Sequence, residues 1–200
     1  MFGYFVTLHD YCLFMEEADD IFLLQKKIAN NDQLAYRRLF ILYYDGLFRF
    51  AIGFTKNKEL AEEIVSDVFI NIWRRRSTIE NISNLKLYLY VSAKNITFNY
   101  LAKLHRDNFA DIDAVEIELE APFSDPGEAM ITREMNSRLK SAIDQLPPRC
   151  KLIFKLIKED GLTYNQTARL LHLSVSTVEN QLAIAIKKIA GTIRYSLKSH

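Results

Sequence analysis

The sequence predicts an all-α protein built from two small helical domains that are joined by an acidic linker. The chain has 200 residues but only six glycines and four prolines, so few breaks interrupt its helical patterns. Apolar residues recur at helical spacing through most of residues 20–106 and again in residues 131–200. Residues 107–130 separate these blocks with eight acidic residues and no Lys or Arg, which is typical of an extended linker.

Residues 1–19 form an N-terminal extension whose first part is apolar and aromatic. It has no basic leader, and His9 and Asp10 interrupt it well short of a membrane span. We therefore expect neither export nor membrane insertion. The extension is either an amphipathic lead-in helix or a mis-assigned start, with Met15 as the true first residue, and we favour the second interpretation.

Four helices are expected in the first block, at residues 20–29, 32–54, 58–75 and 85–105, with a polar loop at 76–84. Asp32 is a suitable N-cap for the second helix because its carboxylate can accept from free amide groups of the first turn. The expected apolar face of that helix consists of Leu34, Leu39, Leu42, Tyr43, Leu47, Phe50 and Ala51.

The second block is expected to begin near Ile131 with a helix, to break at Pro147 and Pro148, and to continue with another helix. Residues 161–190 then match a helix-turn-helix, the unit that lays a short helix in the major groove of DNA. Ser176 and Glu179 have the spacing of a capping box for its second helix. The inward-facing residues of the motif are expected to be Leu162, Ala168, Leu171, Leu173, Val178, Leu182 and Ala185.

Charge is distributed unevenly along the chain. The formal net charge is +2 for residues 1–106, −8 for residues 107–130 and +7 for residues 131–200. A basic block that carries a helix-turn-helix suits a polyanionic partner, because each neutralised phosphate releases counterions. The alternative is a basic face that is only solvated.

No enzyme, metal site or cofactor is expected. The two cysteines, Cys12 and Cys150, have no second Cys or His at metal-ligand spacing, and no phosphate-binding or nucleophile motif occurs. Two isolated cysteines are compatible with a reducing cytoplasm, where we expect the protein to be located.

Two separate segments of the chain resemble one family. AEEIVSDVFINIW (residues 61–73) is similar to the polymerase-binding helix of the extracytoplasmic-function (ECF) group of bacterial RNA polymerase sigma factors. YLYVSAKNITFNYL (residues 88–101) is similar to the promoter-melting helix of that group. LPPRCKLIFKL (residues 146–156) and the helix-turn-helix resemble its C-terminal domain. The resemblance covers about residues 20–195 and implies a region 2-like domain at 20–106 and a region 4-like domain at 131–200.

The resemblance also implies three sets of site residues. The first set would bind the clamp helices of the largest subunit of core polymerase, with Asp67 as the leading candidate: Glu62, Glu63 and Asp67. The second set would bind the unpaired minus-ten strand, although ordinary surface or core roles are open for half of them: Asn81, Asn84, Lys86, Tyr88, Tyr90, Lys94 and Asn95. The third set would bind duplex DNA at the minus-thirty-five element: Arg149, Thr163, Tyr164, Arg169, Ser176, Thr177, Glu179, Asn180, Ala183 and Lys187.

Some residues depart from the family pattern. His172 replaces a usual Gly in the turn, and Glu179 and Ile184 stand where many members have basic residues. The resemblance implies three partners: core polymerase, promoter DNA and an anti-sigma protein that is often membrane-embedded. It also suggests that the acidic linker mimics RNA in the exit path, although the linker is equally suited to be a plain spacer.

The sequence is also compatible with two other functions. An autonomous helix-turn-helix regulator would bind an operator, with N-terminal helices that dimerise or sense a signal. An all-helical interaction scaffold would leave the charge distribution unexplained. The acidic helix at 61–73 favours the sigma factor over the autonomous regulator, because a regulator does not need an acidic strip that matches polymerase.

Overall fold

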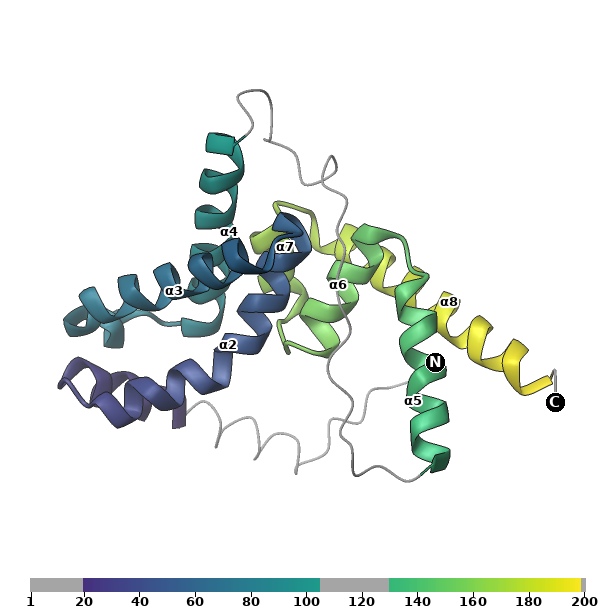
Figure 1. Cartoon of the computed structure of the whole chain (residues 1–200), viewed down its shortest axis with the longest axis horizontal. Coiled ribbons are helices and arrows are strands. Elements are labelled where there is room, and N and C mark those ends of the chain that lie inside the picture. The colour runs from purple at the N-terminus through teal and green to yellow at the C-terminus, as the bar shows by residue number, and fades with distance from the viewer. Residues whose placement is uncertain (1–19, 105–129, 199–200) are drawn as a thin grey trace.

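The computed structural model describes residues 20–104 and 130–198, and every regular element in these two ranges is a helix (Figure 1). The expected all-α fold is therefore confirmed, whereas the N-terminal extension and the acidic linker lie outside the described residues. A first helix covers residues 20–29. It is followed by α2 (Gln33–Thr55), α3 (Lys58–Arg74), the 3-10 helix η1 (Arg76–Asn81), α4 (Leu85–Leu104), α5 (Met130–Asp144), α6 (Pro148–Lys158), α7 (Tyr164–Leu171) and α8 (Val175–Lys198).

Local sequence signals account for several helix ends. The Asp32 carboxylate accepts from the amides of Leu34 and Ala35 at 2.9 and 3.0 Å, which confirms it as the N-cap of α2. Pro148 occupies the first position of α6, where its missing amide hydrogen costs nothing. The loop that we expected at 76–84 contains η1, because Ile79 is buried and its neighbours coil around it.

The apolar face expected for α2 is partly wrong. Leu39, Leu47 and Phe50 are buried, but Leu34 and Leu42 are 77% and 57% exposed. A helix turns by about 100° per residue, which places these two leucines about 100° or more from the middle of the buried face. Apolar character alone did not distinguish them from the core residues.

The helix-turn-helix has the predicted interior but a different helix start. Ala168, Leu171, Val178 and Leu182 are all buried. However, α8 begins at Val175, and the hydroxyl of Ser174 accepts from the Thr177 amide at 3.0 Å. The capping box expected at Ser176 and Glu179 is therefore wrong, since Ser174 already satisfies the first turn.

A true capping box is found one helix earlier, at the start of α7. The Thr163 hydroxyl accepts from the Gln166 amide at 3.2 Å, and the Gln166 side chain accepts from the Thr163 amide at 2.7 Å. The helix ends at His172, which has a left-handed backbone with φ of 54°.

The left-handed residue at the turn leads to a stability prediction. Glycine adopts positive φ without the steric penalty that a Cβ imposes. His172→Gly should therefore raise the free energy of unfolding by about 0.5 kcal/mol, after allowance for the greater entropy of the unfolded glycine chain. Chemical denaturation measures the change. His172→Ala is the matched control, because it removes the imidazole and keeps the Cβ; an equal gain in both variants would contradict the backbone explanation.

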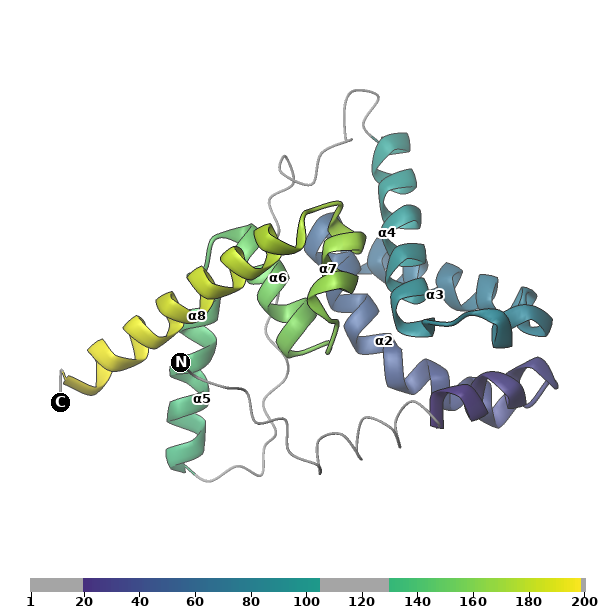
Figure 2. The same ribbon diagram turned by 180° about the vertical axis from the view of Figure 1, so that it is seen from behind.

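The two helical blocks pack against each other. In both views α7 lies beside α4 (Figures 1 and 2). One continuous apolar cluster contains residues of α2, α3 and α4 together with residues of α6, α7 and α8. A second, smaller cluster lies where α5 packs on α8, around Ala142, Leu146 and Ala185. The free chain is thus closed, with its two blocks in direct contact.

Candidate functional site

The predicted minus-ten residues of α4 lie on two opposite faces of the helix. Lys86, Tyr90 and Lys94 follow one another at intervals of four residues and form one stripe. At about 100° per residue, Asn84, Tyr88 and Asn95 lie on the other side. The structure therefore does not gather all seven predicted residues at one place.

The stripe of Lys86, Tyr90 and Lys94 faces the C-terminal block. The Lys94 ammonium donates to the Leu170 carbonyl of α7 at 2.9 Å, and the side chain is only 9% exposed, so burial lowers its pKa. The Lys86 ammonium lies 3.5 Å from the Gly161 carbonyl. The Lys94 ammonium is therefore engaged by protein in the closed chain, whereas Lys86 is only half-buried.

Tyr90 makes the most buried of these contacts. Its side chain is 2% exposed, and its hydroxyl donates to the carboxylate of Asp160, which lies between α6 and α7. Burial raises the pKa of Tyr90 far above its ordinary value, and the Asp160 charge acts in the same direction. Burial also raises the pKa of Asp160, against the opposing effects of Arg49 and Tyr90.

The opposite face of α4 borders a small pocket between α3, η1 and the start of α4. Its volume is about 160 Å³. Its lining residues include one aromatic residue, Tyr88, and two that carry hydrogen-bonding groups, Arg75 and Thr78. A planar base needs such a combination of a stacking surface and hydrogen-bonding groups. The apolar part of the lining consists of Ile72, Ile79 and Ile82.

Hydrogen bonds and one cation–π contact hold η1 and the residues around the pocket in place. The buried Gln25 amide donates to the carbonyls of Ile79 and Ile82 at 2.6 and 2.9 Å. Arg76 lies over the Trp73 ring at 4.8 Å and donates to the Trp73 carbonyl at 2.9 Å, while its other side donates to Asn31. These bonds fix the conformation of a segment that would otherwise be a polar loop.

Sequence reasoning missed Arg75 and Thr78 as candidate DNA-contacting residues. Both belong to the polar segment RRRSTIEN (residues 74–81), whose sequence does not distinguish residues that line the pocket from residues that only face solvent. The nearest signal was the pair of apolar residues, Ile79 and Ile82, within a polar stretch, since they anchor the segment and thereby create the pocket beside it. Of the predicted residues, Tyr88 lines the pocket, and Asn84 caps α4 by accepting from the Leu87 amide at 2.9 Å.

The acidic residues of α3 form a strip beside the end of α4. Glu62 and Glu63 are exposed and Asp67 is half-buried. The Tyr100 hydroxyl lies 2.8 Å from Glu63 and 3.2 Å from Asp67. The hydrogen bond to Glu63, with the two nearby charges, raises the pKa of Tyr100 to about 12. Tyr100 therefore remains neutral, and its single hydroxyl hydrogen can be donated to either carboxylate, of which Glu63 is the nearer.

The predicted minus-thirty-five residues lie along an open surface of the C-terminal block. Thr163 and Tyr164 begin α7, Arg169 is exposed on the same helix, and Arg149 is half-buried near the start of α6. Thr177 is half-buried. The remaining five are exposed on α8: Ser176, Glu179, Asn180, Ala183 and Lys187. Ile184, which stands where many family members have a basic residue, is exposed beside them.

Within residues 20–104 and 130–198, no three His, Cys, Asp or Glu side chains are grouped so that they could hold a metal ion. None of the helices in these ranges is both long and apolar enough to cross a membrane.

Comparison with known families identifies both blocks. The model described as "Sigma-70 region 2" matches residues 39–107, and the model described as "Sigma-70, region 4" matches residues 137–189. The chain is 25% identical over 179 residues to the ECF RNA polymerase sigma-E factor of Escherichia coli (strain K12), covering 86% of this chain and 93% of the relative. It is 21% identical over 164 residues to the ECF RNA polymerase sigma factor SigW of Bacillus subtilis (strain 168), covering 78% and 88%.

Two solved structures share the fold. The sigma factor RpoE in complex with the anti-sigma factor NepR from Bartonella quintana matches with a TM-score of 0.54 and 22% identity, over 80% of this chain and 96% of that one. CnrH in complex with the cytosolic domain of CnrY matches with a TM-score of 0.51 and 19% identity, over 89% and 98%. The models of region 2 and region 4 match in order along the chain, and the two sigma factors from E. coli and B. subtilis are both ECF sigma factors. The chain therefore belongs to the sigma-70 family of RNA polymerase sigma factors, within its ECF group.

Proposed function

We propose that this sigma factor divides promoter recognition between its two blocks. The N-terminal block binds core polymerase through Glu62, Glu63 and Asp67 and captures the unpaired minus-ten strand. The C-terminal block binds duplex DNA at the minus-thirty-five element through α7 and the first half of α8. The pocket beside Tyr88 is the observation that carries this division, because a protein that binds only duplex DNA needs no site for an unstacked base.

Strand opening in this proposal requires no chemical energy from the sigma factor. If the pocket beside Tyr88 binds a base only when that base has left the duplex, the difference in affinity shifts the DNA toward the open state. Catalysis then belongs to polymerase, and the sigma factor contributes recognition. In the same proposal the sigma factor is located in the cytoplasm. It is regulated there by an anti-sigma protein, which can be soluble or membrane-bound.

Two tyrosine variants test the division of labour. Tyr88→Ala removes a stacking surface that contributes about 1–3 kcal/mol per base, so the holoenzyme should bind a single-stranded minus-ten oligonucleotide about 5- to 150-fold more weakly. Tyr164→Ala should instead weaken binding to a minus-thirty-five duplex. Fluorescence anisotropy with each DNA measures both effects. Equal losses on both DNAs, or none on either, would contradict the proposal.

An autonomous regulator would behave differently in the same system. It would bind an operator duplex fully without polymerase, and it would not support promoter-specific initiation when added to core polymerase on a promoter library. That result would reject the sigma-factor mechanism for this chain. The acidic strip at Glu63 and Asp67, within hydrogen-bonding distance of the Tyr100 hydroxyl, favours the polymerase-dependent mechanism.

A further inference from the structure

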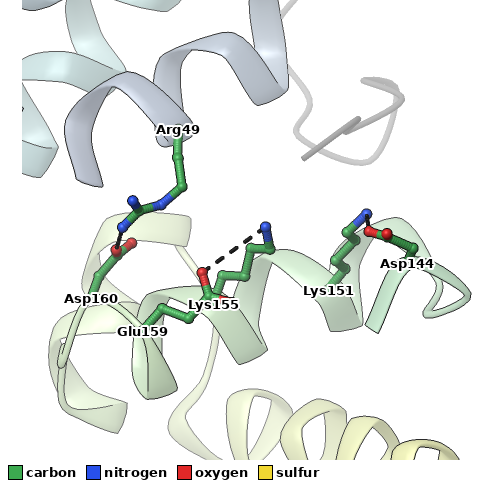
Figure 3. Close-up of polar contacts among 6 residues, drawn as sticks. All are labelled: Arg49, Asp144, Lys151, Lys155, Glu159 and Asp160. Carbon is green, nitrogen blue, oxygen red and sulfur yellow. Dashed lines mark hydrogen bonds and ion pairs between the residues drawn. The ribbon is translucent and has the colours of Figure 1, made fainter. Parts of the chain in front are cut away.

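The contact between the two blocks contains a buried polar cluster. The Arg49 guanidinium of α2 donates to the Asp160 carboxylate at 3.0 Å, across 111 positions of the chain (Figure 3). The Asp160 side chain is only 7% exposed and also accepts from the Tyr90 hydroxyl. Figure 3 shows Arg49 of the N-terminal block pointing to Asp160, which follows the end of α6.

Glycine at position 46 allows this cluster to form. A Cβ at this position would lie 2.4 Å from the Tyr90 hydroxyl and 3.3 Å from the Asp160 carboxylate, and the first of these separations is too short for real atoms. Gly46 lies inside α2, where glycine is normally unfavourable by roughly 1 kcal/mol relative to alanine. The close approach of Tyr90 and Asp160 therefore gives a physical reason for a residue that weakens its own helix.

We propose that Arg49, Tyr90 and Asp160 form a latch that keeps the two blocks closed in the free sigma factor and that opens before both promoter elements are bound. The apolar cluster shared by α4, α6 and α7 supplies contact area, and the latch fixes its register. A buried ion pair adds little net stability by itself, but removal of one partner leaves the other charge uncompensated.

Geometry makes closure incompatible with simultaneous binding of both elements. In the closed chain α4 packs on α7, and α7 packs on α8. Packed helices lie 8–10 Å apart, so the start of α8 lies within about 20 Å of α4. The two promoter elements are roughly 25 base pairs apart, which is about 85 Å of duplex at 3.4 Å per base pair. The blocks must therefore separate to reach both elements.

Closure also occupies side chains that the proposed function needs. Lys86, Tyr90 and Lys94, three of the seven predicted minus-ten residues, contact the C-terminal block instead of DNA. The closed and promoter-bound states therefore compete for the same groups. This consequence rests on the proposed function, whereas the latch itself is a property of the free chain.

Two variants test the latch by different means. Asp160→Ala removes the shared acceptor and leaves Arg49 unpaired, and Gly46→Ala places a methyl group where the Tyr90 hydroxyl lies. Each should shift the closed-to-open ratio of the full-length free protein by about 30-fold toward open. Glu159→Ala is the matched control, because this neighbouring carboxylate pairs with Lys155 of its own helix, at 4.0 Å, and not with Arg49 in the described part of the chain. Circular dichroism checks that the helices are retained.

Small-angle X-ray scattering of the free proteins gives the decisive readout. The radius of gyration should rise in Asp160→Ala and Gly46→Ala and remain at the wild-type value in Glu159→Ala. An extended wild type, or two latch variants as compact as the wild type, would overturn the latch without any bearing on sigma activity.

Transcription on a promoter with both elements gives a second readout. If only the open fraction binds productively, the latch variants should reach half-maximal initiation at a lower sigma concentration, by up to the same 30-fold factor. Variants that open in scattering but need as much sigma as the wild type would overturn the competition between closure and promoter binding.

Discussion

Asp67→Lys should reduce the affinity for core polymerase by 100-fold or more and thereby abolish promoter-specific initiation. The substitution reverses a charge at the C-terminal end of the acidic strip and removes one of the two carboxylates within hydrogen-bonding distance of the Tyr100 hydroxyl, at 3.2 Å. Loss of one partner of a desolvated charge pair at an interface costs several kcal/mol, much of it from the unpaired charge that remains on the other protein. Surface plasmon resonance with immobilised core polymerase measures the loss.

The control for this variant is Glu80→Lys, which makes the same charge change at an exposed position of η1. Net charge is then identical in the two variants, so a loss confined to Asp67→Lys assigns the effect to the strip. Thermal denaturation verifies that both variants are folded. If both lose affinity equally, long-range electrostatics explains the binding, and the strip has no specific role.

Ala168→Leu should abolish minus-thirty-five binding while core polymerase binding is retained. Ala168 is buried within the helix-turn-helix, and its carbonyl accepts from the Leu173 amide at 2.9 Å. Extra methylene groups in a packed interior cost about 1–3 kcal/mol and force neighbouring elements apart. Because α7 fixes the orientation of α8, the groove-reading residues should lose their alignment, with a loss of duplex affinity of at least about 30-fold.

Ala190→Leu provides the comparison, since it is the same substitution at an exposed position on α8. It should change neither the free energy of unfolding nor duplex affinity by a measurable amount. Denaturant unfolding and fluorescence anisotropy with the duplex give the two values for each variant. Retained duplex binding in Ala168→Leu would mean that the helix pair tolerates a wider crossing than its packing implies.

Much of the fold was predictable because local chemistry determines it. Helical periodicity, the Asp32 cap and the break at Pro147 and Pro148 depend on residues close together in the chain, and all three are confirmed. One error concerns the N-cap of α8. Ser174 and Ser176 are both able to cap a helix, and only the actual path of the turn decides that Ser174 does so.

The candidate sites could be predicted only in part. Family motifs indicated Tyr88 and Asp67, but Arg75 and Thr78 became candidates only when the path of η1 placed them around a pocket. Likewise, Leu42 is exposed and Leu39 is buried on the same helix, although both are leucines in one apolar pattern. Such distinctions depend on neighbours that are distant in sequence, and no short window contains them.

By itself the sequence determined that this chain is all-α, that it resembles a sigma factor, and that its charge is divided between a basic C-terminal block and an acidic linker. Composition, periodicity and motif order carry this information because each is a property of residues close along the chain. Only the tertiary structure decided that the two blocks are closed on each other. That result depends on Arg49 meeting Asp160 across 111 positions and on the space beside Gly46 that admits Tyr90.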